Sequence, residues 1–174
     1  SGFEIGRMYA GLRGLHPVLA VDEAGARWPV GSVEVGLAMR DLLSHASSRF
    51  GAEFALALAP ELVDGVMWAD DIRASLLWSE NCRCYIDHAN RLSGSALLDA
   101  LPRARDTPVD GYRMARIANR HYAVTRISLS AQLDRFGTAS RAGHPASVFV
   151  FSDRSAQFAD YRAGRMKALG ALAL

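Results

Sequence analysis

Hydrophobic and polar residues alternate along the first part of the chain as they do in paired strands. We interpret residues 15–21 as one strand and 31–36 as its returning partner, with a turn at 22–25 between them. Successive strand residues point to opposite faces, so Glu34 lies on the face opposite the two valines that flank it. The pattern therefore predicts a hairpin near the beginning of the chain.

A helical spacing of apolar residues follows the hairpin. Residues 39–50 carry leucine, alanine and phenylalanine on one side, which predicts a helix. Residues 54–59 form a short apolar run that predicts a strand. The stretch 62–86 is ambiguous, and within it we expect a helix over residues 70–77 and a strand around Tyr85.

In the second half of the chain, the spacing of apolar residues again alternates between that of helices and that of strands. We expect a short helix, two strands joined by a tight turn, a further strand and a final helix that runs to the end of the chain. These elements fall at residues 95–101, 112–118, 121–130, 146–151 and from 153 or 155 to 174. The order predicts one α+β domain over residues 1–174, with a mixed, mostly antiparallel sheet flanked by helices.

Composition limits the function classes more than it identifies one. The chain has 174 residues, half of them hydrophobic, and twenty basic residues face eighteen acidic ones, so no nucleic-acid partner is expected. Lys167 is the only lysine among the twenty. This bias towards arginine is typical of a GC-rich genome, and it is also compatible with a few arginines that bind an anion.

The two cysteines, Cys82 and Cys84, allow three interpretations. With His88 they could provide ligands for zinc or copper, but no fourth ligand is evident and we predict no metal or cofactor. In an oxidising compartment they could form a local disulfide. The third interpretation is a pair of inert thiols, and the sequence leaves the choice open.

The familiar catalytic motifs are absent from the sequence. It contains no G-x-S-x-G, no phosphate-binding loop and no H-E-x-x-H. We therefore expect no enzymatic activity. The alternative is a small α+β hydrolase that uses the scattered histidines and aspartates.

The opening segment resembles a signature of double-Cache-type sensory domains, which are PAS-like extracytoplasmic domains of bacterial sensor kinases, diguanylate cyclases and chemoreceptors. The matching residues are Gly2, Phe3, Glu4, Gly6, Arg7, Gly11, Arg13 and Pro17. Residues 31–36, Gly-Ser-Val-Glu-Val-Gly, resemble the return strand of the same domains. Near the other end, a strand passes through Asp153 into the last helix, as such domains often do before they enter the membrane.

The resemblance implies a PAS-like Cache fold and a periplasmic location in a protein of the inner membrane. Cache domains normally begin with a long helix, whereas this sequence begins inside the motif, so the dimer contact made by such helices is in doubt. The apolar tail 168–174 follows several basic residues. It is either the beginning of a membrane span or the end of an ordinary core helix.

The candidate ligand-binding residues come from the motif and from aromatic side chains. Arg7 and Arg13 could bind a carboxylate through paired hydrogen bonds, or one of them could pair with Glu4 and fix the loop. Glu34 could contact ligand, pair with one of these arginines or lie exposed. The aromatic candidates, each of which could instead be a core residue, are Tyr9, Trp28, Trp68, Trp78, Tyr85 and Tyr122.

The expected function is that of an extracytoplasmic ligand-sensing domain. A small molecule, with anions as leading candidates, would bind and shift the last helix, which passes the change to a cytoplasmic output module. The full-length protein would be membrane-anchored and homodimeric. The competing hypotheses are a ligandless structural or dimerisation module of a receptor and, third, the hydrolase.

Overall fold

The computed structural model describes residues 2–87, 92–101, 104–109, 111–129 and 146–171. Within these ranges the chain forms two antiparallel sheets with helices packed against them, so the α+β prediction is confirmed. The larger sheet has six strands in the order β5-β6-β4-β9-β8-β7. Its strands are β4 (Glu53–Leu58), β5 (Leu76–Ser79), β6 (Cys84–Asp87), β7 (Tyr112–Ile117), β8 (Arg120–Leu129) and β9 (Ala146–Asp153).

The centre of the six-stranded sheet joins distant parts of the chain. β4 pairs with β9 from Glu53 opposite Phe151 to Leu58 opposite Ala146. Both strands are apolar over most of their length, as expected for strands that are covered on both faces. Hairpins β5–β6 and β7–β8 extend the sheet on either side of this central pair.

Different elements cover the two faces of this sheet. One face packs against α4 (Leu92–Ala100) and the short helix η1 (Ala104–Asp106), where Leu98 and Leu101 are fully buried. We call it the α4 face. The other, which we call the α1 face, packs against α1 (Met39–Phe50), α2 (Pro60–Val66) and β1 (Gly2–Ile5). Helix α3 (Ala69–Ser75) follows α2.

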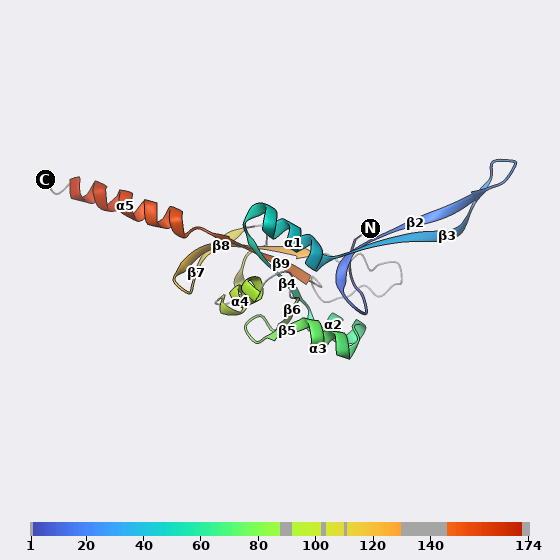
Figure 1. Cartoon of the computed structure of the whole chain (residues 1–174), viewed down its shortest axis with the longest axis horizontal. Coiled ribbons are helices and arrows are strands. Elements are labelled where there is room, and N and C mark those ends of the chain that lie inside the picture. Colours follow the sequence, from blue (N-terminus) through green and yellow to red (C-terminus); the bar gives the residue numbers. More distant parts are fainter. Residues whose placement is uncertain (1, 88–91, 102–103, 110, 130–145, 172–174) are drawn as a thin grey trace.

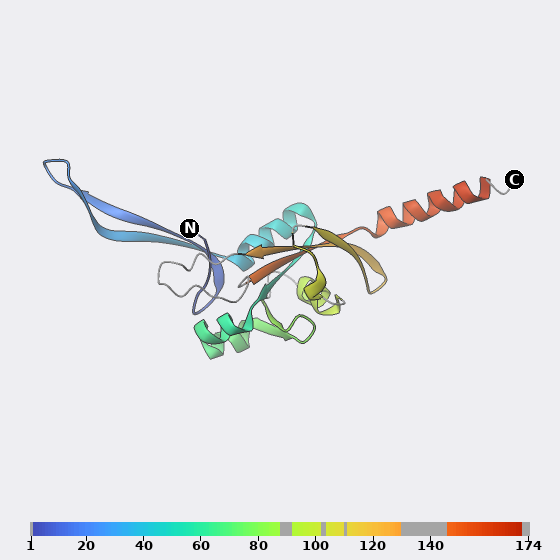
Figure 2. The same ribbon diagram turned by 180° about the vertical axis from the view of Figure 1, so that it is seen from behind.

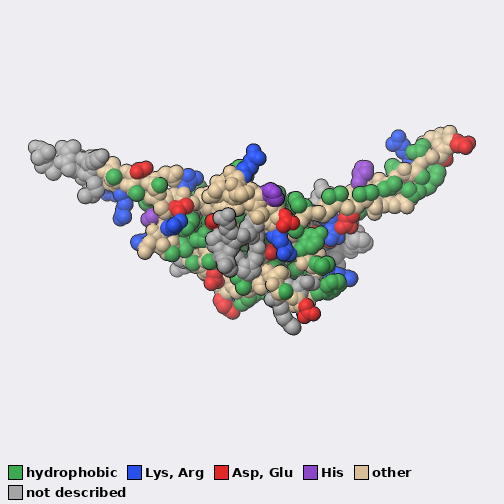
Figure 3. All heavy atoms as spheres, in the orientation of Figure 1, with side chains coloured by type: hydrophobic (Ala, Val, Ile, Leu, Met, Phe, Trp, Pro, Cys, Tyr) green, Lys and Arg blue, Asp and Glu red, His purple; other side chains and the backbone are tan. Residues whose placement is uncertain are grey.

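The smaller sheet has three strands in the order β1-β2-β3, and most of it projects from the body. β2 (Ala10–Val21) and β3 (Arg27–Ala38) form a long hairpin that leaves the body as one arm (Figure 1). Its base is buried with β1, whereas almost all of its outer residues are exposed. Hydrophobic side chains run along this arm in the space-filling view (Figure 3).

The last helix forms a second arm at the opposite end of the molecule (Figures 1 and 2). α5 (Ser155–Ala171) begins two residues after β9 ends. Its first turn is fixed to β8, because the rings of Phe158 and His121 stack with their centroids 4.2 Å apart. Among the described residues, we find no helix of the length and hydropathy needed to cross a membrane.

Several elements lie where the sequence pattern predicts them. The helix at residues 39–50 has the predicted bounds, and Gly51 ends it in a left-handed conformation with φ of 62°. The hairpin strands are longer than predicted, since they reach from Ala10 to Ala38. The sequence analysis did not identify β1, α2 or β5 as elements of their own.

Candidate functional site

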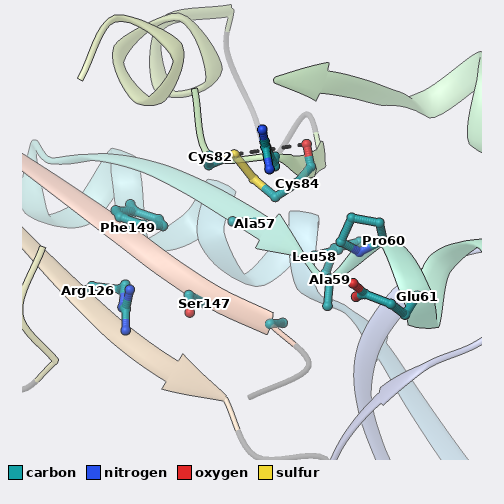
Figure 4. Close-up of a pocket in the computed structure, with 12 residues that line it drawn as sticks. Ala57, Leu58, Ala59, Pro60, Glu61, Cys82, Cys84, Arg126, Ser147 and Phe149 are labelled. Atoms are coloured by element: carbon teal, nitrogen blue, oxygen red, sulfur yellow. Dashed lines mark hydrogen bonds between the residues drawn. A yellow bond between two sulfur atoms is a disulfide. The ribbon is translucent and has the colours of Figure 1, made fainter. Parts of the chain in front are cut away.

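A cavity of about 260 Å³ lies on the α4 face, between the sheet and the segments that cover it (Figure 4). The strands β4, β6, β8 and β9, the beginning of α2 and the turn between β5 and β6 contribute to its wall. The lining residues are Ala57, Leu58, Ala59, Pro60, Glu61, Cys82, Arg83, Cys84, Arg126, Ala146, Ser147 and Phe149.

The floor of the cavity follows from strand register. Residues directly opposite each other in an antiparallel pair point to the same face. Arg126 of β8 lies opposite Phe149 of β9, and Ser147 lies opposite Ala57 of β4. The alternation along three strands therefore brings an arginine, a hydroxyl and apolar side chains onto one floor.

A disulfide-closed turn forms another part of the wall. Cys82 and Cys84 are joined by a disulfide, with their Cα atoms 5.2 Å apart, so the disulfide interpretation is the one that the structure contains. Arg83 between them has a positive φ of 49°, a backbone conformation that residues other than glycine rarely adopt. His88, the remaining member of the metal hypothesis, lies outside the described residues. Within the part that is described, no group of three or more histidine, cysteine or acidic residues could hold a metal ion.

Hydrogen bonds fix this turn against α4. The side-chain amide of Asn81 donates to the carbonyl oxygens of Leu98, Asp99 and Leu101, and the hydroxyl of Ser79 donates to Asp99 at 2.7 Å. The carbonyls at a helix C-terminus lack partners inside the helix, so Asn81 satisfies groups that need one. The turn and the end of α4 are thereby held together as one wall.

The charged side chains of the wall favour an anion. Arg83 and Arg126 carry positive charge, and Glu61 carries the single negative charge among the lining residues. A guanidinium group can donate two parallel hydrogen bonds to a carboxylate or phosphate. Beside the floor, Ser128 lies opposite Ser147, and its hydroxyl oxygen is buried with no hydrogen-bond partner among the described residues.

A second hollow, of about 630 Å³, lies on the other face where α5 leaves the sheet. Its residues come from β7, β8, β9 and the first turns of α5. Tyr112 and Tyr161, which form its edges, are 70% and 67% exposed, so the hollow is a broad surface depression. Like the first cavity, it is open to solvent, and none of its lining residues carries a negative charge.

Three of the predicted site residues meet on the smaller sheet. Arg13 lies between Glu4 and Glu34, with its Nη1 atom 3.4 Å from Glu4 and its Nε atom 2.9 Å from Glu34. The pairing considered in the sequence analysis is therefore present. These carboxylates neutralise the arginine and join β1, β2 and β3.

The other motif residues also contribute to this joint. The ring of Tyr9 lies against Gly11 and Gly36, where a side chain would meet its atoms at 3.0 Å and 2.8 Å. Arg7 is exposed, and its backbone carbonyl accepts a hydrogen bond from the backbone of Trp68 at 3.0 Å. The motif residues thus lie together, but none of them lines either hollow.

The predicted aromatic residues lie in separate places. Trp78 packs edge-on against Tyr85, and the Tyr85 hydroxyl donates to Asp64 at 2.9 Å, a hydrogen bond that raises the pKa of the tyrosine. Trp68 precedes α3 and is about half exposed, whereas Tyr122 is buried against Phe151 in the core. Trp28 is exposed on the hairpin. None of these side chains lines the cavity.

The sequence analysis missed Arg126 and Ser147, although a signal for Arg126 is present. In β8, Tyr122 and Val124 point into the core, and Arg126 continues the same alternation. An arginine at an inward position of an apolar strand is unusual, because a buried charge needs a partner. That pattern distinguishes Arg126 from the many exposed arginines of this chain.

The fold and the cavity define an α+β protein with an arginine-containing site between its sheet and a disulfide-closed turn. No protein family, no curated protein and no solved structure matches the chain.

Proposed function

We propose that this chain is the ligand-sensing domain of a bacterial transmembrane receptor, and that a small anion is its ligand. The observation that carries the proposal is the path of β9. Ser147 and Phe149 of this strand line the cavity, and the same strand leads directly into α5. A group bound in the cavity therefore contacts the element that holds the output helix.

The size and chemistry of the cavity support a small ligand. Sites for drug-sized molecules have volumes of roughly 300–1,000 Å³, and this cavity is slightly smaller, at about 260 Å³. Its lining combines apolar side chains with Arg83, Arg126 and Ser147, which could hold an anion. Short-chain carboxylates have the charge and the size that this site requires.

The junction between β9 and α5 is suited to transmit a shift of the strand. The backbone of Arg154 donates to the carbonyl of His121 at 2.7 Å, and the backbone of His121 donates to the hydroxyl of Ser155 at 3.0 Å. These bonds hold the first turn of α5 on β8. A ligand that binds one position of β9 more tightly than another would redistribute the helix between two orientations.

The receptor context rests on the resemblance to double-Cache-type domains. From this resemblance we propose a periplasmic location, a membrane anchor in the full-length protein and a homodimer, with a kinase, cyclase or chemotaxis module as the output. The disulfide is compatible with an oxidising compartment, where such bonds persist.

The proposal is tested by thermal unfolding of the chain in the presence of acetate, lactate, succinate and glutamate. We expect at least one of these to raise Tm in a saturable manner, since a ligand that binds only the folded state stabilises it. The Arg126→Gln variant should lose this increase relative to its own unliganded Tm. Arg116→Gln removes an exposed arginine of β7 and should retain it.

Two results would overturn the proposal. The first is the absence of any saturable shift with these anions, which would favour the ligandless structural module. The second is an anion shift of equal size in the Arg126→Gln and Arg116→Gln variants, which would place binding elsewhere on the surface.

A further inference from the structure

The arm formed by β2 and β3 has one face that carries apolar side chains along most of its length, with His16 as the polar exception. In the registers of this sheet, Leu12 lies opposite Leu37, Val33 opposite His16, and Trp28 opposite Ala20. All of them point to one side, which we call the apolar face of the hairpin. Its large side chains are between 38% and 68% exposed: Leu12, Val18, Trp28, Val33, Val35 and Leu37.

The apolar face continues the hydrophobic core outwards. Phe3 lies opposite Leu12 and is only 4% exposed, and Ala10 at the same end of β2 is 1% exposed. Both belong to the core under α1 and α2. Near the body, the helices therefore cover the base of the hairpin as a second layer. Farther out, the apolar residues continue without this second layer.

The opposite face of the hairpin is mixed in chemistry. At its base it carries the ion pairs of Arg13 with Glu4 and Glu34. Farther out it carries fewer large apolar side chains than the apolar face, namely Leu15, Leu19 and Val21, which are between 45% and 59% exposed. An apolar sheet face is stable in water when it is packed against a second layer. The described residues supply that layer only at the base of the hairpin.

We propose that the apolar face of the hairpin is the contact surface for a second copy of this chain. Two hairpins would pack face to face about a two-fold axis, so that each buries the same residues of the other. Aligned sheets pack in this way about 10 Å apart. The inference does not depend on ligand binding in the cavity.

The size of the surface agrees with a reversible dimer. Twelve residues per strand, at about 3.3 Å each and with strands about 4.8 Å apart, give a projected face of roughly 400 Å² per copy. The accessible area is larger because side chains stand above the sheet. Two such faces give a projected area of about 800 Å², and their side chains bring the accessible area that would be buried towards about 1,000 Å², where specific but weak interfaces begin.

The charge at the tip of the arm disfavours a lipid surface as the occupant. The turn carries Asp22 and Glu23, with Arg27 at the start of β3 as the single basic residue beside them, and Asp22 is fixed by a hydrogen bond from the backbone of Ala26 at 2.8 Å. Segments that insert into bacterial membranes present an excess of basic residues to the anionic headgroups.

The experiment is sedimentation velocity of the whole chain over a range from low to high micromolar concentration. We expect a concentration-dependent monomer–dimer equilibrium. The double variant Val33→Asp/Val35→Asp should remain monomeric and weaken the association by at least about 10-fold, because four carboxylates would meet in the interface. Both valines are more than half exposed, so thermal unfolding should show an unchanged fold.

Phe50→Asp is the matched control, because Phe50 is a 71% exposed apolar residue at the end of α1, away from the hairpin. It should dimerise like the parent chain. A parent chain that stays monomeric throughout overturns the proposal, as does a dimer that persists in the double variant or is lost equally in Phe50→Asp. Binding of a monomeric chain to phosphatidylglycerol vesicles that depends on the two valines also overturns it.

Discussion

Position 11 requires glycine, because two strands and an aromatic ring leave no room for a side chain at its Cα atom. A methyl group there would lie 2.5 Å from the carbonyl oxygen of Leu37 and 3.0 Å from the ring of Tyr9. The first neighbour is backbone and cannot move aside without shifting β3. The glycine at position 11 of the motif is thus explained by close packing within this chain.

Gly11→Ala should lower the free energy of unfolding by about 1–3 kcal/mol, the usual cost of forcing extra atoms into a packed site. Chemical denaturation measures the change. Gly31→Ala in β3 is the control, because a methyl group there meets nothing within 4 Å. Equal effects of the two substitutions would show that the contact with Leu37 does not matter.

Arg13 shows where residue-level prediction from the sequence ends. The sequence offered ligand binding and pairing with an acidic residue as alternatives, and the contacts with Glu4 and Glu34 select the second. All three side chains are about one-third exposed or more, so each pair adds little stability, typically about 0.2–1 kcal/mol. Their contribution is to fix the register of three strands.

At the scale of elements, local signals predicted helices better than they predicted strand pairing. Helix α1 and its glycine stop follow from residues 39–51 alone, because capping and apolar spacing act within a few residues. The strand at residues 146–151 was predicted as well. Its position between β4 and β8 depends on residues almost a hundred positions earlier, which local patterns do not contain.

The N-terminus of α5 allows a prediction about pH. Asp153 accepts hydrogen bonds from the hydroxyl of Ser155 and, at 2.8 Å, from its backbone N–H, and these two bonds, the hydroxyl's first, lower the pKa of the carboxyl below its ordinary value of 3.8. The charged form thus stabilises the helix above that pH. Its contribution is lost as the pH falls through the lower pKa of the folded state.

Asp153→Ala should therefore destabilise the first turn of α5 by about 1 kcal/mol at neutral pH, as the loss of an N-terminal cap does. Hydrogen exchange of the α5 amides measures the effect. Asp153→Asn keeps a capping oxygen and should preserve protection while removing its dependence on acidic pH. If the alanine variant protects α5 as well as the parent chain does, the capping role is wrong.

At the scale of the whole molecule, two arms extend from one central body. The hairpin and α5 leave at opposite ends, while the cavity lies in the body between them (Figure 1). The body has two hydrophobic clusters, one on each face of the six-stranded sheet. β9 connects the cavity to α5 directly, and the hairpin is not part of this connection.

Hydrogen exchange should divide the molecule into these parts. Amides of β4, β8 and β9 should exchange most slowly, because buried clusters cover both faces of the central sheet. Amides in the outer half of the hairpin should exchange quickly in dilute solution. They should become protected as the protein concentration rises, whereas the protection of β4 amides should not change. If all of these amides were equally protected at every concentration, both the two-arm arrangement and the dimer contact would be wrong.

The sequence by itself determined the mixed α+β class, the presence of a hairpin near its beginning and the bounds of α1. These properties depend on periodicity, caps and turns, which are set by neighbours in the chain. Only the tertiary structure decided that Arg126, Ser147 and Cys82–Cys84 share one cavity while the motif arginine is neutralised elsewhere. The reason is physical: the position of a cavity depends on which strands pair, and pairing is fixed by the burial of both sheet faces at once.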